Sequence, residues 1–160
     1  KKLSKQPQFI DKIDIFGYNW DANELGTMYK GTLEGVNPGT CNKMDKLIHK
    51  SSKWDGLEKY KYSIAIENSY KKNYFTEKFT DCILAKTIPI YYGCPNISDF
   101  FPKDCYYWLD INSPDCFTKL EEILNSPITD KQIKSMEIAR KLILEKYNVW
   151  EVVYNIIKND

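Results

Sequence analysis

Thr76, Glu77 and Lys78 place a hydroxyl, a carboxylate and an ammonium side by side at the start of a predicted helix. Apolar runs at Tyr62–Ile66 and Thr87–Tyr92 precede and follow that helix. The positive end of a helix dipole attracts anions, and free backbone N–H groups there suit a phosphate. Lys78 adds a full positive charge, although a lysine in the first turn slightly disfavours the helix itself. The triplet therefore predicts a site for a phosphorylated ligand.

Further polar residues lie where the first apolar run ends. Glu67, Asn68 and Ser69 follow that run directly, and Tyr74 lies in the loop that leads to the triplet. In an open α/β sheet, ligands bind outside the carboxyl ends of the strands, where loops lead into helix N-termini. A carboxylate such as that of Glu77 is suited to hold sugar or ribose hydroxyls through charge-assisted hydrogen bonds. Together these residues predict recognition of a sugar nucleotide.

A purely structural interpretation of the same residues stays open. Thr76 can be a helix N-cap, and Glu77 an acid that the helix dipole favours. Lys78 can form an i, i+3 ion pair with Asp81 on a solvated helix face. The polar loop residues can be turn and packing residues, and Tyr91 and Tyr92 are interpreted as strand core rather than as a stacking platform. Spacing alone favours this structural interpretation.

The elements around the triplet predict the fold class. The apolar runs at 62–66 and 87–92 are predicted strands, and apolar residues recur at helical spacing between Phe75 and Ile83, in a helix that ends near Lys86. A strand, a helix and a strand in succession are typical of a βαβ unit in a parallel sheet. We therefore predict the class α/β.

The remaining elements are predicted from end signals and apolar periodicity. They are strands at Lys12–Phe16 and Tyr106–Leu109, a helix from Ser113 to Asn125 with Pro114 at its first position, a helix capped by Thr129 or Asp130 with an apolar stripe of Ile133, Met136, Ile143 and Tyr147, and a last amphipathic helix at Val149–Ile157. We expect one domain over residues 1–160, with a long loop at about 18–54 and a helical tail at about 129–158.

Composition excludes several classes of partner and site. The chain has 23 basic and 22 acidic residues without a long block of one sign, which argues against nucleic acid as a partner. No run is long and apolar enough for a membrane span in this chain. The only histidine, His49, is interpreted as a surface residue, so a His-rich metal site is excluded. No Asp-x-Asp occurs, which fits a donor site without a chelated metal.

The five cysteines are odd in number and contain no CxxC pair. Buried free thiols therefore fit better than disulfides or a zinc site. This favours a reducing compartment, although only mildly. The residues concerned are Cys41, Cys82, Cys94, Cys105 and Cys116.

The motifs YSIAIENS and YFTEKFTDCILAKTIPIYYGCPNI, which run from Tyr62 to Ile97, resemble the donor-binding signature of the α1,3/α1,4-fucosyltransferase family. In that family an apolar strand ends in Glu-Asn-Ser, a short loop leads to Tyr-x-Thr-Glu-Lys, and a helix returns to a Pro-containing strand closed by Gly. Each element is present here in the same order. Weaker similarity extends from about Lys12 to Leu124.

The resemblance implies a Rossmann-like parallel sheet that corresponds to the C-terminal half of a GT-B glycosyltransferase. This lobe would bind GDP-fucose, and an N-terminal acceptor lobe of the same enzyme would hold the glycan acceptor. The reaction would be inverting transfer of L-fucose to a glycan hydroxyl, with no cofactor or metal required. The donor-binding residues would be Glu67 and Asn68 lining the pocket beside Ser69, Tyr74 and Thr76 shaping the loop, Glu77 holding donor hydroxyls, and Lys78 neutralising the diphosphate.

Two features of the family are not found in this sequence. The family's general base belongs to the N-terminal lobe, so no catalytic base is assigned to this chain. An arginine that helps to hold the diphosphate precedes the KIDIFG-like strand in the family, whereas the only arginine here is Arg140. We therefore expect the isolated chain to bind the donor weakly.

Three alternatives stay open for the function. The lobe could use another nucleotide sugar, it could be a non-catalytic sugar-nucleotide-binding module, or it could be a Rossmann-like scaffold without a ligand. The expected location is cytoplasmic or peripheral to a membrane, or the Golgi lumen if an upstream anchor exists. The chain opens without Met, so it is interpreted as a possible piece of a longer protein.

Overall fold

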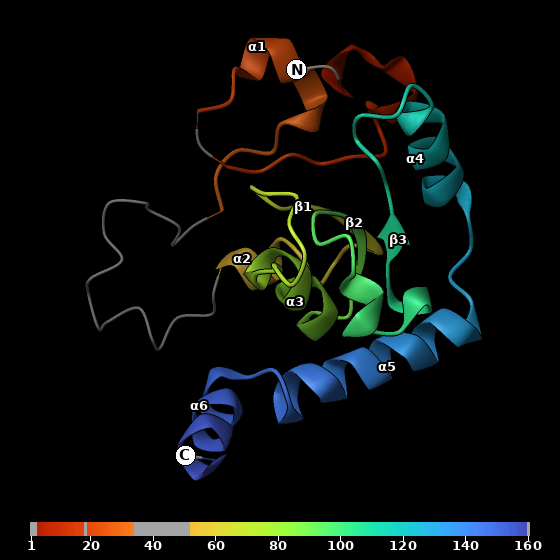
Figure 1. The fold of residues 1–160 in the computed structure, drawn as a ribbon. Helices are drawn as coiled ribbons and strands as arrows, with labels where there is room; N and C mark the ends of the chain where they lie inside the picture. Colours follow the sequence, from red (N-terminus) through yellow and green to blue (C-terminus); the bar gives the residue numbers. More distant parts are fainter. Residues whose placement is uncertain (1–2, 18, 34–51, 160) are drawn as a thin grey trace.

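The computed structural model describes residues 3–17, 19–33 and 52–159, and its centre is a three-stranded parallel sheet (Figure 1). The strands are β1 (Tyr62–Ile66), β2 (Ile88–Tyr92) and β3 (Tyr107–Trp108), in the order β1-β2-β3. β1 pairs with β2 in a register from Tyr62 opposite Ile88 to Ile66 opposite Tyr92. The strand predictions at 62–66 and 87–92 are therefore confirmed, and that at 106–109 is confirmed in a shorter form.

Helices connect and flank the strands of this sheet. α3 (Glu77–Leu84) joins β1 to β2 and buries Phe79, Cys82 and Ile83, which confirms the predicted helix with a slightly earlier end. The other helices are α1 (Ala22–Leu25), α2 (Ser52–Asp55), α4 (Cys116–Asn125), α5 (Asp130–Glu145) and α6 (Val149–Asn159), with 3-10 turns at Leu3–Lys5, Pro7–Phe9, Gly26–Met28, Ile97–Asp99 and Lys103–Cys105.

The core consists of two clusters, one on each side of the sheet. Phe79 of α3 and Met136 of α5 belong to the first cluster, and Ile90 and Leu120 belong to the second, which packs the N-terminal segments and α4. Figure 1 shows α5 on one side of the sheet and the N-terminal segments on the other. Four of the five residues of β2 are buried, as expected for a parallel strand that is covered on both faces. The predicted α/β class with a parallel sheet flanked by helices is confirmed.

The predicted strand at Lys12–Phe16 is wrong. Only Ile15 makes a parallel bridge, to Tyr29. Gly17 follows with a φ of 126°, and the residues before Tyr29 form a 3-10 turn, so neither segment stays extended long enough to build a ladder.

The start of the predicted helix at Ser113 is also wrong, because α4 begins at Cys116. Residues 111–115 form turns instead, with backbone N–H groups of Ser113 and Cys116 bonded to the carbonyls of Asp110 and Ser113. The Ser113 hydroxyl donates to the carboxylate of Asp115, so it does not cap the helix. Pro114 therefore lies in the turn that precedes α4.

The two helices predicted after Pro127 are present as α5 and α6, but not every residue of the predicted apolar stripe is buried. Thr129 caps α5 in a capping box with Gln132, whose side chain is buried for this reason. Ile133, expected in the apolar stripe, is 49% exposed, since the capping box turns its neighbour Gln132 inward. Tyr147 lies beyond the end of α5 and packs its ring 5.3 Å from that of Phe101. α6 exposes apolar side chains, among them Trp150 at 81%.

Only residues 19–33 and 52–54 of the predicted loop at about 18–54 belong to the described part of the chain. Its described parts contain α1, the 3-10 turn at Gly26–Met28 and α2, so they are not purely irregular. Cys41 and His49 lie outside the described residues. No helix within the described ranges is long and apolar enough to cross a membrane.

The cysteines in the described part of the chain are free thiols, as predicted. Cys82, Cys94 and Cys105 are buried, and Cys116 is partly buried. Burial raises the pKa of the Cys82 thiol to about 11 and that of Cys105 to about 12. These thiols therefore keep their protons at pH values where an unfolded chain would already form thiolates.

The raised pKa values predict slow alkylation of the native thiols. Because the unfolded cysteine loses its proton near a pKa of about 8.5, the native state binds more protons above that pH, and the free energy of unfolding should fall as pH rises towards 11. At pH 8, iodoacetamide should label Cys82 and Cys105 far more slowly in native protein than in urea, as measured by peptide mass spectrometry. Equal rates in both conditions would contradict this account.

The close packing of Gly93 generates a prediction for stability. A Cβ atom there would lie 2.3 Å from Cγ of Glu67 and 2.8 Å from Oη of Tyr91. Gly93→Ala should therefore lower the free energy of unfolding by about 1–3 kcal/mol, the usual cost of overpacking. Urea unfolding would measure this, with the exposed Ser98→Ala as a control that should change stability by less than about 0.5 kcal/mol.

Candidate functional site

The predicted site residues lie at the carboxyl ends of β1 and β2, and Glu67 is the most deeply placed of them. Its side chain is 6% exposed. Its carboxylate accepts hydrogen bonds from the backbone N–H and the hydroxyl of Thr76, each at 2.8 Å, and the Tyr91 hydroxyl lies at 3.4 Å. Glu67 therefore faces protein donors instead of an open pocket.

Tyr91 continues this network into the next turn. Its hydroxyl oxygen accepts a hydrogen bond from the backbone N–H of Cys94 at 3.0 Å. Burial, and after it the nearby carboxylate of Glu67, keeps the pKa of Tyr91 well above its usual range, so the hydroxyl stays a donor. The ends of β1 and β2 and the start of α3 are thus joined by one set of hydrogen bonds.

Thr76 is the N-cap of α3, as the structural interpretation predicted. Its hydroxyl oxygen accepts from the N–H of Lys78 at 3.3 Å, and its carbonyl accepts from the N–H groups of Phe79 and Thr80. Backbone N–H groups of the first turn that were expected to be free therefore have protein partners. The helix dipole and the Lys78 ammonium remain as the attraction for an anion.

Glu77 and Lys78 project from this first turn with only a loose contact between them. The Glu77 side chain is 62% exposed and that of Lys78 32%, and the Nζ–Oε1 distance is 3.8 Å. A hydrogen bond from its own backbone N–H, followed by the charges of Lys78 and Lys53, lowers the pKa of Glu77. The carboxylate is therefore ionised at neutral pH and available to accept hydrogen bonds.

The ion pair expected between Lys78 and Asp81 is not formed. Asp81 pairs with Lys53 of α2 instead, at 2.6 Å. This part of the structural interpretation is wrong, because a residue distant in sequence takes the carboxylate. Within α3, Lys78 is therefore paired only with Glu77, at 3.8 Å.

The loop between β1 and α3 is held by two asparagines that the sequence did not single out. The side chain of Asn96 donates to Oδ1 of Asn73 at 2.8 Å and accepts from the Asn73 backbone N–H at 2.9 Å. Asn73 has a φ of 60°, a conformation that asparagine tolerates better than most residues, which is the signal that could have indicated its role. Asn68 and Ser69 are exposed in this loop, and Tyr74 is partly buried.

Three aromatic side chains meet at the same edge of the sheet, and we name them the aromatic patch: Tyr70, Tyr92 and Trp108. Tyr70 lies 5.4 Å from Tyr92 and 6.3 Å from Trp108 between ring centroids. Tyr70 is 59% exposed and Trp108 38%. Tyr91 is strand core, as expected, whereas Tyr92 is only partly buried and belongs to this patch.

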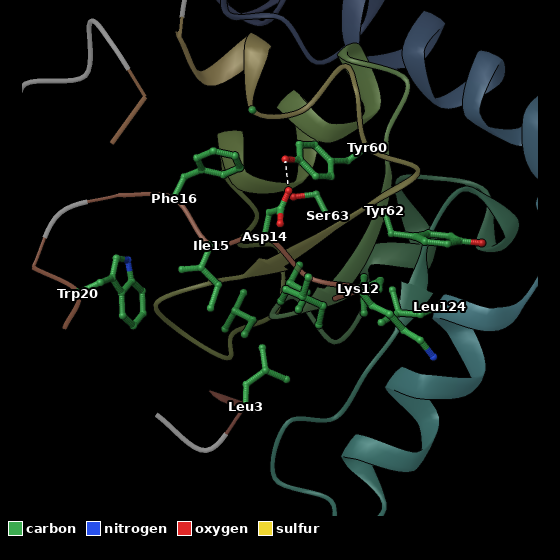
Figure 2. Close-up of a pocket in the computed structure, with 15 residues that line it drawn as sticks. Leu3, Lys12, Asp14, Ile15, Phe16, Trp20, Tyr60, Tyr62, Ser63 and Leu124 are labelled. Carbon is green, nitrogen blue, oxygen red and sulfur yellow. Dashed lines mark hydrogen bonds between the residues drawn. The ribbon is translucent and has the colours of Figure 1, made fainter. Parts of the chain in front are cut away.

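A cavity of about 470 Å³ lies elsewhere, between the sheet and residues 12–16 (Figure 2). It is lined mainly by apolar side chains and by none of the predicted site residues. Within it the Tyr60 hydroxyl donates to Asp14 at 2.7 Å, and burial, followed by this hydrogen bond, raises the pKa of Tyr60 to about 12. Its lining suits apolar contacts and not a diphosphate, so it is not the candidate site.

No group of three or more His, Cys, Asp or Glu side chains in residues 3–17, 19–33 and 52–159 is placed to hold a metal ion.

Comparison with known proteins identifies the family. The C-terminal domain of glycosyltransferase family 10, the fucosyltransferases, matches residues 27–135. The chain belongs to this family. Its parallel sheet with flanking helices is consistent with the Rossmann-like C-terminal half of a GT-B glycosyltransferase, as the resemblance implied.

Curated relatives support the same family. A putative fucosyltransferase-like protein of Arabidopsis thaliana is 42% identical over 52% of the chain and 16% of its own length. The alpha-(1,3)-fucosyltransferase B of Drosophila melanogaster is 36% identical over 54% of the chain and 19% of its own length. A GDP-fucose protein O-fucosyltransferase 3 of Rattus norvegicus is 40% identical over 30% of the chain and 10% of its own length. The chain thus spans less than a fifth of each relative, and no solved structure matches it significantly.

The cap of α3 generates a prediction for stability. Thr76→Ala removes the acceptor for the Lys78 N–H and one donor to the buried Glu67, so it should lower the free energy of unfolding by about 1–2 kcal/mol or more. Thr118→Ala, at an exposed position of α4, is the matched control and should change stability by at most about 0.5 kcal/mol. Equal effects of the two substitutions in urea unfolding would count against the cap.

Proposed function

We propose that this chain is the donor-binding domain of a fucosyltransferase and that it binds GDP-fucose at the N-terminus of α3. The observation that carries the proposal is the position of Lys78, which projects from the first turn of α3 while Asp81 is paired with Lys53. A single ammonium at the positive end of a helix is suited to a diphosphate. The family match and the name of the GDP-fucose-dependent rat relative support fucose as the sugar.

Each site residue has a proposed role in donor binding. Lys78 binds the diphosphate, and the ionised Glu77 accepts hydrogen bonds from donor hydroxyls. Glu67 acts through Thr76, because its carboxylate fixes the N-cap and so the direction of the first turn. Asn68, Ser69 and Tyr74 line the loop beside the donor.

The proposed reaction is inverting transfer of L-fucose to a glycan hydroxyl. As the bond between fucose and the diphosphate breaks, negative charge grows on the departing GDP, and Lys78 with the helix dipole stabilises it. In this proposal the Lys78 ammonium supplies part of the positive charge that the departing diphosphate requires. A carboxylate base that deprotonates the acceptor hydroxyl is assigned to a separate acceptor lobe.

The first test is calorimetric titration of the chain with GDP-fucose, GDP and UDP at high protein concentration. GDP and GDP-fucose should bind saturably, and UDP should not. Lys78→Ala should weaken the binding of GDP by about 1.5–3 kcal/mol, or roughly tenfold to a hundredfold, because a charged partner of the diphosphate is lost.

The matched control is Lys141→Ala, because Lys141 also forms an ion pair at 3.8 Å, with Glu145 on α5. This variant should bind GDP as the unmodified chain does. Unchanged affinity in Lys78→Ala, or equal binding of UDP and GDP, would overturn the assignment of the donor site.

A further inference from the structure

We propose that the aromatic patch of Tyr70, Tyr92 and Trp108 binds a hexopyranose ring of the acceptor glycan. The inference rests on the proposed function, since it adds a site for the second substrate at the same sheet edge. The patch combines three large rings from three separate segments: the loop after β1, the end of β2, and β3.

The exposure of these rings points to a ligand. Tyr70 is 59% exposed and Trp108 38%, although each contacts the other at 6.3 Å. Aromatic rings that gather at a surface instead of entering the core leave apolar area in contact with water. A ligand that covers their faces would remove that cost.

The patch is held in place before any ligand arrives. The Tyr92 hydroxyl accepts a hydrogen bond from the Asn112 side chain at 2.7 Å, and the Asn112 backbone N–H is bonded to Asp110 at 2.9 Å. Trp108 belongs to β3 and lies 6.0 Å from the buried ring of Tyr91. A fixed aromatic surface loses little conformational entropy on binding.

The shape of the patch favours a sugar ring over a flat base. The Trp108 ring is inclined by 72° to Tyr70 and by 52° to Tyr92, so the rings form a corner and not a parallel slot. A pyranose ring presents apolar C–H groups on one face and hydroxyls around its rim. Exposed Asp110 and Asn112 beside the rings can bond such hydroxyls.

The patch lies at the carboxyl ends of β2 and β3, the sheet edge that also carries the proposed donor site. Tyr91 packs its ring 4.9 Å from Phe79 of α3, and successive side chains of a strand point to opposite faces. Tyr92 therefore faces away from α3, whereas Trp108 pairs with Tyr91 in the β2–β3 register and lies on the α3 side, so the patch spans both sides of this edge. The acceptor hydroxyl must reach the anomeric carbon of the donor sugar, so an acceptor ring has to bind next to the donor site, and a patch at this sheet edge meets that condition.

The test is saturation-transfer NMR on the chain with methyl β-D-galactopyranoside and methyl β-D-glucopyranoside. At least one sugar should receive saturation on the C–H protons of one ring face. Tyr70→Ala and Trp108→Ala should reduce that signal several-fold, and Tyr70→Phe should keep it because the ring remains.

The matched controls are Tyr154→Ala and Trp150→Ala, which remove exposed rings of α6 and should leave the signal unchanged. Tyr70 is largely exposed, so its variant keeps the test valid if Trp108→Ala does not fold. Absence of saturation transfer to both sugars, or equal loss in patch and control variants, would overturn the proposal.

Titration with GDP separates this inference from the proposed donor site. Tyr70→Ala should bind GDP with unchanged affinity. A parallel loss of GDP binding would show that the patch holds the nucleoside, against the proposal. Failure of GDP to bind even the unmodified chain would instead count against the donor site.

Discussion

The buried carboxylate of Glu67 is the constraint on which the rest of the site depends. A carboxylate this deep in protein is tolerated only where hydrogen-bond donors surround it. Thr76 supplies two donors and Tyr91 a third, while Gly93 leaves the space that the side chain needs. The donors come from the start of α3 and from β2. If either element shifted, the buried carboxylate of Glu67 would lose hydrogen-bond donors.

This anchoring changes how the start of α3 can meet an anion. In phosphate sites built on backbone N–H groups, the first turn is open to the ligand. Here the oxygens of Thr76 occupy N–H groups of that turn, so the site is rigid but offers fewer backbone donors. Anion recognition as proposed would then depend on side chains, chiefly Lys78 and Glu77, which project from this capped turn.

The unit from β1 to β2 could be predicted from the sequence because its signals are local: apolar runs, helical spacing and a cap residue. The failures have non-local causes. Lys12–Phe16 has the composition of a strand but lacks an extended partner, and Asp81 pairs with Lys53 across a gap that spacing within one helix cannot reveal. The contact of Asn73 with Asn96 and the aromatic patch likewise join segments that only the folded chain brings together. The family motif indicated a candidate site, but it did not show that Glu67 faces inward.

The positive charge at the start of α3 limits how much of a diphosphate's negative charge this chain could neutralise by itself. The diphosphate of a nucleotide sugar carries more than one negative charge, whereas Lys78 contributes one positive charge and the helix dipole roughly half of another. Part of the Lys78 charge is also screened by Glu77 at 3.8 Å. If the diphosphate binds at α3 as proposed, a second cation is needed to complete the charge balance. Under the proposed function, exclusion of water from the site would strengthen each of these charge interactions.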